Sequence, residues 1–396
     1  MANTRLTRAA GTATTATKYT LSMWIKRSKL GSEMNLIGVS SGNTIELIKF
    51  NSNNKLYWYN RDAASNAAEN YTSNVFRDTS GWYHLVFSYD STQNAAANQR
   101  KLYINGVNQT WGSVAAIQSN AVAGMNLSGA TRTIGAESSP SNYFDGSMSH
   151  IHFVDGTVYA ASTFGSTDST TGEWKINTSP SITMGNNGFT ILKDGNTITD
   201  QSSNSNNFSL ASGTLTKTED CPSNVFATIN PLFFASDAAT FANGNNTVNY
   251  NTDNSRSAFG SLGMTSGKYY FEVKIVSDSN NRGSYGICDT LYSNLNSTGA
   301  FIDTSSGYAY SADGQKVNGG SSSSFGDAIT TGAIVGVALD MDNLKVYFSK
   351  NGVFQNSGDP TSGSTGTGAA FTVTADRTYL PAIRMRNGTK GSFNFG

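Results

Sequence analysis

The chain of 396 residues contains only two cysteines, three histidines and six prolines. Cys221 stands beside Pro222 in a segment that we predict to be a connector, so it and Cys288 are expected to be free thiols rather than part of a disulfide framework. No run approaches the roughly 20 apolar residues of a membrane-spanning helix. Residues 1–18 also lack the apolar run of a signal peptide. We therefore expect synthesis in the cytoplasm and no membrane insertion.

Charge is scarce as well, at 14% of the residues against about 25% in typical soluble domains. Lys plus Arg and Asp plus Glu are equal at 27 each, so no net field attracts nucleic acid or anionic lipid. The chain instead has 40 glycines and many Ser, Thr and Asn residues. These features predict a neutral surface of hydroxyl and amide groups and no nucleic-acid partner.

Short alternating strands separated by Gly, Asn, Ser and Asp predict an all-β protein built of antiparallel sandwiches. We expect strands over residues 19–26, 34–40, 44–50, 55–59, 82–90 and 101–105, and again over 268–276, 283–288, 334–340, 344–349 and 379–385. Between the two groups, residues 214–222 lack a clear period, and Asn230-Pro231 favours an extended segment. We predict domains over 1–213 and 233–396, joined by a linker over 214–232.

One pattern occurs in both halves: an apolar strand that ends in Asp, then an aromatic strand, then Asn-Gly. The turns are Asn105-Gly106 and Asn351-Gly352. A type I′ hairpin turn needs positive φ at both central residues, which Asn tolerates and Gly adopts freely. The pattern therefore predicts two β-domains of related design and says more about the fold than about the function.

The first half resembles the laminin-G/concanavalin A-like lectin superfamily through residues 81–87 (GWYHLVF) and 101–106 (KLYING). Residues 19–28 (YTLSMWIKRS) and 143–156 (YFDGSMSHIHFVDG) are similar to the form of this domain found in virion proteins of marine bacteriophages. Residues 200–208 (DQSSNSNNF) and 227–232 (ATINPL) also resemble that family.

The second half resembles a SPRY domain through blocks that occur in the family order. They are GKYYFEV at 267–273, GIC at 286–288, VGVALD at 335–340, VYFSKNG at 346–352 and FNFG at 393–396. Both resemblances imply β-sandwiches of the jelly-roll type, in agreement with the two hairpins.

Glycoside hydrolysis requires two carboxyl groups that face one cleft. In concanavalin-like glucanases these alternate along one strand as Glu-x-Asp-x-x-Glu, and no such string occurs here. The candidate glutamates are scattered, at Glu46, Glu137, Glu173 and Glu272. We therefore expect no enzymatic activity, and a polysaccharide-processing enzyme on the same scaffold is the alternative.

Loop aspartates offer the hard oxygen ligands that calcium prefers, and Asp90, Asp145 and Asp155 are the candidates in the first half. The alternative is that each stabilises a turn through its own backbone without an ion. His150 and His152 would share a strand face, with His84 as a remote third metal ligand. Hydrogen-bonded strand histidines are the alternative interpretation there.

Exposed aromatic rings are the candidate ligand-binding groups. In the run Tyr57-Trp58-Tyr59, neighbours face opposite sides of a sheet, so at least one ring should lie outside the core. An exposed ring stacks on a sugar or anchors a protein partner. We predict Trp58, Tyr59 and Trp111 as ligand-binding residues, with core packing as the alternative.

The resemblances and the neutral surface together predict a non-enzymatic structural protein of a phage virion. It would be a surface appendage or decoration of the tail, fibre or capsid, made in the host cytoplasm and assembled as a homo-oligomer. Its expected partners are neighbouring virion subunits and host-surface glycans, with no cofactor other than calcium. The other alternative is an adaptor whose SPRY-like half binds a peptide.

Overall fold

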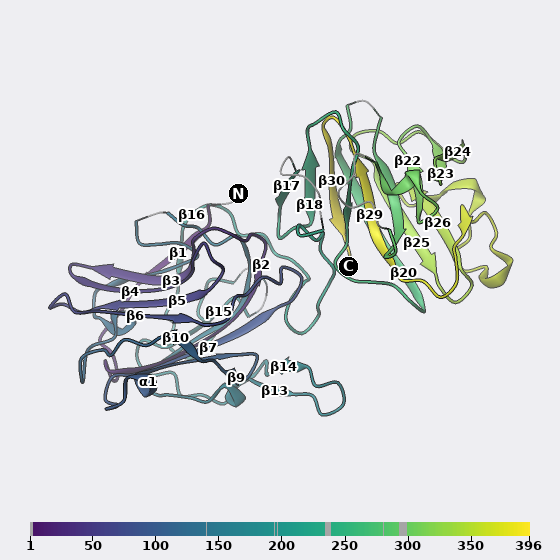
Figure 1. The fold of residues 1–396 in the computed structure, drawn as a ribbon. Coiled ribbons are helices and arrows are strands. Elements are labelled where there is room, and N and C mark those ends of the chain that lie inside the picture. The colour runs from purple at the N-terminus through teal and green to yellow at the C-terminus, as the bar shows by residue number, and fades with distance from the viewer. Residues whose placement is uncertain are drawn as a thin grey trace. The chain divides into compact units, whose positions relative to one another are not determined.

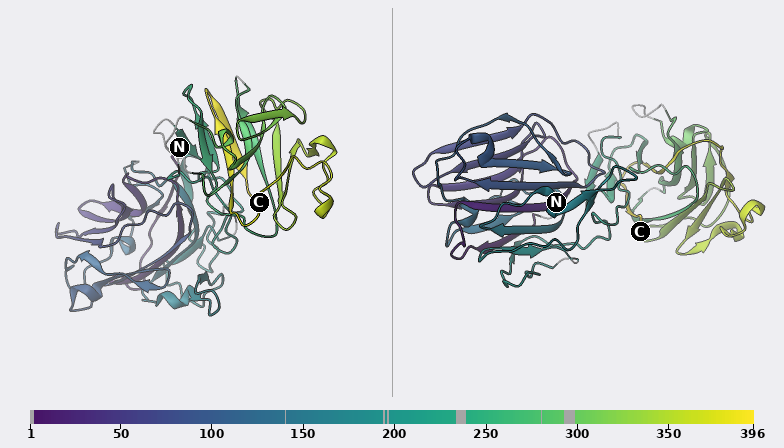
Figure 2. Two further views of the ribbon diagram at one scale, coloured as in Figure 1. Left: turned by 45° about the vertical axis from the view of Figure 1, so that its right-hand side comes forward. Right: turned by 90° about the horizontal axis from the view of Figure 1, so that it is seen from below.

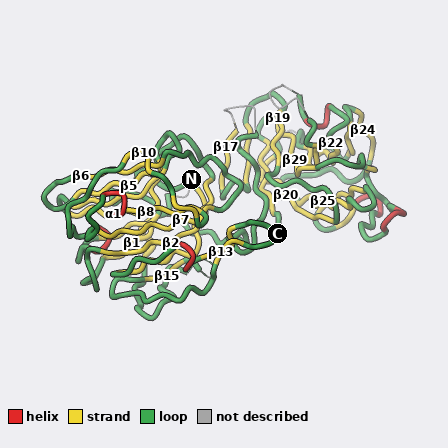
Figure 3. The backbone as a smooth tube through the Cα atoms, turned by 60° about the horizontal axis from the view of Figure 1, so that its bottom comes forward, coloured by secondary structure: helices red, strands yellow, loops and turns green. Residues whose placement is uncertain are grey.

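The computed structural model describes residues 3–139, 141–193, 195, 197–233, 239–279, 281–292 and 299–396. Strands account for 43% of the chain and helices for 5%, so the predicted all-β class is confirmed, and Figure 3 shows how little helix there is. Two compact units are formed, residues 1–225 and 226–396 (Figure 1). No helix among the described residues is long and apolar enough to cross a membrane.

The N-terminal unit contains two large antiparallel sheets, whose strands can be followed in Figure 2. Its strands are β1 (Arg5–Ala9), β2 (Lys18–Arg27), β3 (Met34–Ser41), β4 (Thr44–Phe50), β5 (Leu56–Arg61), β6 (Ala67–Thr72), β7 (Tyr83–Asp90), β8 (Arg100–Ile104), β9 (Val107–Asn108), β10 (Trp111–Ser113), β11 (Thr131–Ile134), β12 (Gly146–Asp155), β13 (Gly165–Thr167), β14 (Trp174–Ile176), β15 (Phe189–Ile191) and β16 (Ser209–Ser212). The larger sheet has the order β10-β6-β5-β4-β3-β11-β1-β16, and the smaller has β15-β12-β2-β7-β8-β9. β13 and β14 form a separate pair.

The core of this unit lies between the two large sheets. β4 alternates between buried and half-buried residues, as expected for a sheet with one face on the core. β2 is instead buried along nearly its whole length. Its second face is covered by residues 156–188, which we call the strap, and Ala161 and Phe164 of the strap pack on Val86 of β7. The central strands β2 and β7 of the smaller sheet are therefore enclosed on both faces.

The C-terminal unit is a second pair of antiparallel sheets. Its strands are β17 (Ala239–Ala242), β18 (Thr247–Tyr250), β19 (Arg256–Phe259), β20 (Lys268–Ser277), β21 (Ser284–Asp289), β22 (Gly307–Ser311), β23 (Gln315–Asn318), β24 (Ser321–Ser324), β25 (Ile334–Asp340), β26 (Lys345–Lys350), β27 (Val353–Phe354), β28 (Phe371–Thr372), β29 (Tyr379–Met385) and β30 (Thr389–Asn394). One sheet has the order β17-β18-β30-β20-β25-β26-β27, with β28 also paired to β26, and the other has β19-β29-β21-β22-β23-β24. The helical elements of the chain are α1 (Ala96–Gln99), η1 (Gly124–Asn126), η2 (Ala161–Thr163), η3 (Phe301–Asp303), η4 (Gln355–Ser357) and η5 (Gly363–Thr365).

The two Asn-Gly turns have the predicted geometry. Both residues have positive φ in each turn, 47° and 79° at Asn105 and Gly106, and 51° and 82° at Asn351 and Gly352. In each turn the Asn side chain also accepts a hydrogen bond from the strand that precedes the aromatic strand, from His84 N of β7 at 2.8 Å and from Ile334 N of β25 at 2.9 Å. The same residues thus build the same local structure in both units.

The boundary between the units falls inside the predicted linker, but the linker residues are packed. Asp220 accepts hydrogen bonds from Lys26 Nζ at 2.8 Å and from Trp82 Nε1 at 3.0 Å, which holds its segment on the N-terminal unit. Ile229 is fully buried in the core of the C-terminal unit. Residues 214–225 thus belong to the first compact unit and residues 226–232 to the second.

Candidate functional site

Trp58 was expected to bind a ligand, and the structure shows that this is wrong because its ring is fully buried. The inward residues of β5 are Leu56, Trp58 and Asn60, whereas Tyr57 and Tyr59 are half-buried on the other face. Trp58 Nε1 donates a hydrogen bond to Oε1 of Glu46 at 3.1 Å. The alternation of the aromatic run was predicted correctly, but Trp58 is the member that faces the core.

Trp111 also packs on the core rather than standing free. Its ring lies 6.3 Å from that of Trp58, and its Nε1 donates a hydrogen bond to the carbonyl oxygen of Arg100 at 2.9 Å. The half-buried side chain closes the edge of the sandwich, and its indole N–H is already bonded within the protein. Tyr59 is the predicted ring that keeps an outward position.

The three predicted calcium ligands do not come together. Asp145 immediately precedes β12 and Asp155 ends it, so they lie at opposite ends of one ten-residue strand. Asp155 accepts hydrogen bonds from the backbone amides of Thr14 at 2.6 Å and Asn187 at 3.1 Å. Asp90 accepts one from the amide of Thr92 at 3.0 Å. Asp90 and Asp155 thus fasten turns, and the three aspartates do not form one calcium site.

The three histidines lie on or beside the outer face of the smaller sheet, under the strap. Within the described ranges, no group of three His, Cys, Asp or Glu side chains is placed to hold a metal ion. Each ring instead meets a hydroxyl group, His84 with Ser22 at 2.9 Å and His152 with Thr190 at 2.9 Å. Desolvation by burial lowers the pKa of His84 and of His152 to about 3. Both rings are therefore neutral at physiological pH.

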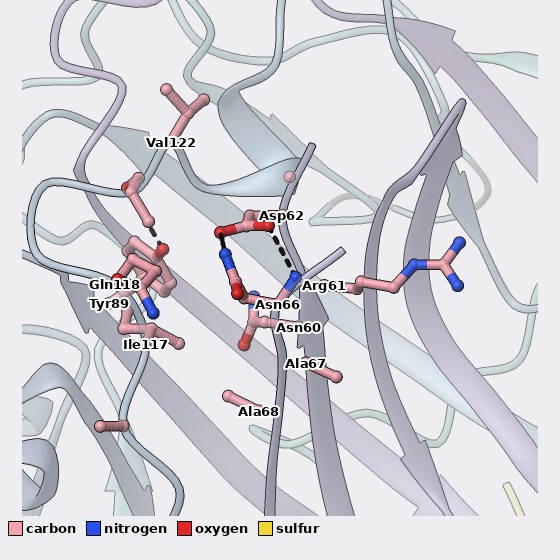
Figure 4. Close-up of a pocket in the computed structure, with 13 residues that line it drawn as sticks. Asn60, Arg61, Asp62, Asn66, Ala67, Ala68, Tyr89, Ile117, Gln118 and Val122 are labelled. Carbon is pink, nitrogen blue, oxygen red and sulfur yellow. Dashed lines mark hydrogen bonds between the residues drawn. The ribbon is translucent and has the colours of Figure 1, made fainter. Parts of the chain in front are cut away.

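A pocket of about 200 Å³ opens at the end of the β5–β6 hairpin (Figure 4). Its walls come from the end of β5, the turn that follows, the start of β6, the end of β7 and the loop before and into η1. The lining residues are Asn60, Arg61, Asp62, Asn66, Ala67, Ala68, Tyr89, Ala116, Ile117, Gln118, Ala121, Val122 and Gly124. Asn60, Ala68, Tyr89 and Gly124 are buried and form the floor, whereas the other residues are more accessible and form the rim.

Asn60 places a hydrogen-bond donor in this floor. Its side chain is 7% exposed, and its Oδ1 accepts a hydrogen bond from Nη1 of Arg100 at 2.8 Å. A guanidinium can only donate, so this contact fixes which end of the amide is oxygen. The Nδ2 group points away from Arg100 and, in the described part of the chain, has no hydrogen-bond partner. A ligand in the pocket would meet an unpaired amide donor.

Arg100 is a fully buried cation that supports Asn60 from below. Its guanidinium donates to neutral oxygens, including Oδ1 of Asn70 at 2.7 Å and the carbonyls of Ala115 at 2.8 Å and Trp58 at 3.1 Å. Desolvation lowers the pKa of Arg100 to about 10, against the attraction of Glu46. The side chain therefore stays charged at neutral pH and orders the amides around it.

Glu46 lies under the pocket but is shut off from it. Its Oε1 accepts hydrogen bonds from the Tyr19 hydroxyl and Trp58 Nε1, and its Oε2 accepts one from the Met125 amide at 2.9 Å. Gly124 forms the separating floor, because a Cβ there would lie 2.8 Å from Cβ of Glu46. The carboxylate is fully buried and its two oxygens are already bonded, so it does not face a ligand.

Asp62 supplies the carboxylate of the rim. Its Oδ1 accepts from the Asn66 amide at 2.9 Å and its Oδ2 from Asn66 Nδ2 at 2.8 Å. The side-chain bond from Asn66 lowers the pKa of Asp62, so the group is ionised at neutral pH. Tyr89 anchors the opposite wall through a hydrogen bond from its hydroxyl to the Ala121 carbonyl at 3.3 Å. The pocket thus combines one buried donor, one acidic acceptor and several small apolar walls.

Sequence reasoning missed Asn60 and Arg100. The alternation of β5 could have indicated Asn60, because it places this residue two positions after Trp58 on the same face of the strand. A polar residue in an inward position of a strand needs a partner, and that partner is the equally unexpected Arg100 at the start of β8.

Comparisons with known proteins agree with this architecture. Residues 2–162 match the model of the concanavalin A-like lectin/glucanases superfamily, and residues 268–396 match that of the SPRY domain. The chain therefore carries an N-terminal concanavalin A-like domain and a C-terminal SPRY domain. Domains of these two kinds suggest a binding or adaptor role.

Individual relatives each match less than half of the chain. The crystal structure of the SPRY domain of human HERC1 is 18% identical with a TM-score of 0.33, over 42% of this chain and 96% of that one. A human SPRY domain is 20% identical with a TM-score of 0.32, over 40% and 96%. The ATP-dependent RNA helicase Ddx1 of Drosophila melanogaster is 28% identical over 133 residues, which span 33% of this chain but only 16% of the helicase.

Proposed function

We propose that the chain is a non-catalytic carbohydrate-binding component of a bacteriophage virion. The observation that carries the binding role is the pocket beside Asn60, whose lining includes both the amide donor of the buried residue Asn60 and the rim carboxylate of Asp62. Sugars present both acceptors and donors, and a site of this kind satisfies both. The match of this unit to a superfamily that includes lectins supports the same ligand class.

The size of the pocket limits what enters it. A volume of about 200 Å³ corresponds to about six or seven water molecules at the volume each occupies in the liquid. One sugar ring or one substituent fits such a space, whereas a longer glycan would extend from it into solvent. We therefore propose that the chain binds one residue of a host-surface glycan.

The pocket supports binding rather than hydrolysis. Glycosidases place two carboxyl groups about 5–10 Å apart across the scissile bond. Among the residues that line this pocket, Asp62 is the single carboxylate, and both of its oxygens are bonded to Asn66. Incubation with a host polysaccharide that the chain binds should release no reducing ends. Release that disappears on Asp62→Asn substitution would identify an enzyme instead.

The virion assignment is supported by the sequence at residues 19–28 and 143–156, which resembles phage virion proteins, and by the neutral surface. Quantitative mass spectrometry of purified phage particles tests it. We expect the chain in the particle at a fixed copy number, and cryo-electron microscopy should place it on the surface of the head or tail. Absence from purified particles would contradict the assignment.

The C-terminal unit offers a candidate surface for neighbouring virion subunits. Tyr270 is 50% exposed on the outer face of β20, and its ring lies over Gly336, where an added Cβ would be 2.5 Å from the Tyr270 hydroxyl. Ile334, 36% exposed, stands on the same face. An exposed aromatic residue beside aliphatic surface is typical of protein contacts. Tyr270→Ala should reduce incorporation into particles while leaving glycan binding unchanged.

A glycan array probed with the intact chain tests the binding role. We expect binding to a restricted set of bacterial surface glycans, and loss of that binding on Ala67→Trp substitution, which fills the pocket from its exposed rim. Ser323→Val, on the exposed strand β24 of the other unit, is the matched control. Failure to bind any glycan, or full binding by the filled-pocket variant, would contradict the proposal.

A further inference from the structure

We infer that the pocket selects sugars carrying an N-acyl group, such as an acetamido sugar, an inference that rests on the proposed carbohydrate-binding function. The starting point is the polarity of the floor. The Nδ2 group of Asn60 can only donate, and the hydrogen bond from Arg100 to Oδ1 prevents the amide from presenting its oxygen instead. The ligand atom that reaches the floor must therefore be an acceptor.

An acetamido group supplies three features that this pocket matches. Its carbonyl oxygen is an acceptor for Asn60 Nδ2, and its N–H is a donor for the rim carboxylate of Asp62. Its methyl group is apolar, and the apolar walls include Ala68, Ile117 and Val122. Because Asn60 is 7% exposed, a donor left unpaired by a poorer ligand carries a penalty.

Two other sugar substituents fit less well. A carboxylate, as in a uronic acid, would accept from Asn60 but would lie near the ionised Asp62, whose pKa is lowered by its bonds to Asn66. The cation beneath the floor does not compensate, since Arg100 already donates to five oxygens of the protein. A sugar hydroxyl group could accept the hydrogen bond from Asn60 Nδ2, but it has no methyl group to cover the apolar walls of the pocket, which would stay in contact with water.

Arg100 fixes which end of the Asn60 amide faces the pocket. Nη1 and Nη2 donate to the side-chain oxygens of Asn60 and Asn70, so both amides are held with oxygen toward the cation and nitrogen away from it. Oδ1 of Asn70 accepts a second hydrogen bond from the Ala115 amide at 3.0 Å, and among the described residues its buried Nδ2 atom has no partner. The pocket floor is therefore a fixed donor.

Titration calorimetry and ligand-observed NMR on the intact chain test the inference with three probes. These are the methyl α-glycosides of N-acetylglucosamine, glucose and glucuronic acid. We expect the acetamido sugar to bind at least about 10-fold more tightly than either of the others. Asn60→Asp should reduce its binding about 10- to 100-fold, because the variant presents a carboxylate oxygen where the wild type presents a donor.

Asn60→Asp is chosen because it retains the acceptor that Arg100 needs and should fold, which thermal unfolding checks. Asn53→Asp is the matched control, since Asn53 is exposed in the turn at the opposite end of β5. Equal or tighter binding of glucose or glucuronate, or unchanged acetamido binding by a folded Asn60→Asp variant, would overturn the inference but leave the carbohydrate-binding role standing. Absence of binding to all three, together with an array that shows no glycan binding, would overturn both.

Discussion

The indole Nε1 of Trp174 donates a hydrogen bond to Nδ1 of His84 at 2.9 Å. Trp174 belongs to the strap and His84 to β7, so this bond ties the strap to the smaller sheet. The indole of Trp24 also stacks on the His84 ring, with 4.7 Å between the ring centroids. Nδ1 accepts this hydrogen bond, so it cannot carry a proton of its own. The contact therefore requires the neutral form of the His84 ring.

Protonation of these histidines should weaken the N-terminal unit in mild acid. Burial lowers the pKa of His84 and of His152 to about 3, against about 6.5 in the unfolded chain. The unfolded state therefore binds protons first as the pH falls, so the stabilisation is complete above pH 6.5 and is lost progressively toward pH 3. By pH 5 we expect a loss of about 2 kcal/mol per histidine.

Urea unfolding between pH 7.5 and 5 measures this loss while most carboxylates remain ionised. The double substitution His84→Gln and His152→Gln removes the titrating groups and should flatten the pH dependence in this window. A wild-type free energy of unfolding that stays constant from pH 7.5 to 5 would contradict the neutral buried rings.

The two Asn-Gly turns should respond differently to the same substitution. At Gly106 an added Cβ would lie 2.3 Å from the Trp174 ring, whereas nothing described lies within 4 Å of the corresponding position at Gly352. Positive φ strains Ala in both turns by about 1 kcal/mol. We expect Gly106→Ala to cost a further 1–3 kcal/mol, roughly the range for overpacking.

Chemical denaturation monitored by tryptophan fluorescence measures the first variant well, because all five tryptophans lie in the N-terminal unit. Circular dichroism follows Gly352→Ala in the other unit. Equal losses of stability in the two variants would show that Trp174 does not rest on the Gly106 turn.

Arg100 should be a main determinant of stability as well as of pocket geometry. Arg100→Met keeps much of the side-chain volume but removes the donor to Asn60 Oδ1 and one of the two donors to Asn70 Oδ1, together with the bonds to three backbone carbonyls. We expect a loss of roughly 2–4 kcal/mol in the free energy of unfolding. Arg77→Met, at an exposed position, is the matched control and should stay within about 0.5 kcal/mol of wild type. A neutral Arg100→Met variant would mean that the buried network is not formed.

The sequence predicted the sandwich well because its signals are local. Turn residues such as Asn105 and Asn351 need positive φ wherever they occur, and strand alternation is visible in any short window. The same alternation shows that Trp58 and Asn60 share a face, but it does not show that this face is the core. That assignment depends on β4 and β6, which pair with β5, and on the second sheet packed against it.

The pocket could not be predicted because it is assembled from distant segments. Asn60 becomes a fixed donor only when Arg100, 40 residues later, is buried beneath it. Likewise the strap covers histidines that the sequence offered as a metal site, and Trp174 reaches His84 across 90 residues. A carboxylate at a loop end can either bind an ion or fasten a turn, and the sequence alone does not distinguish these roles. Asp155 has the second role, because it accepts a hydrogen bond from the backbone amide of Thr14.

Hydrogen–deuterium exchange on the intact chain, with and without a glycan identified on the array, tests the central claim most directly. Bound glycan should slow exchange in the peptides that cover residues 60–68 and 116–124, with little change in residues 226–396. Protection confined to any other part of the chain, with these two segments unaffected, would show that the pocket beside Asn60 is not the carbohydrate site.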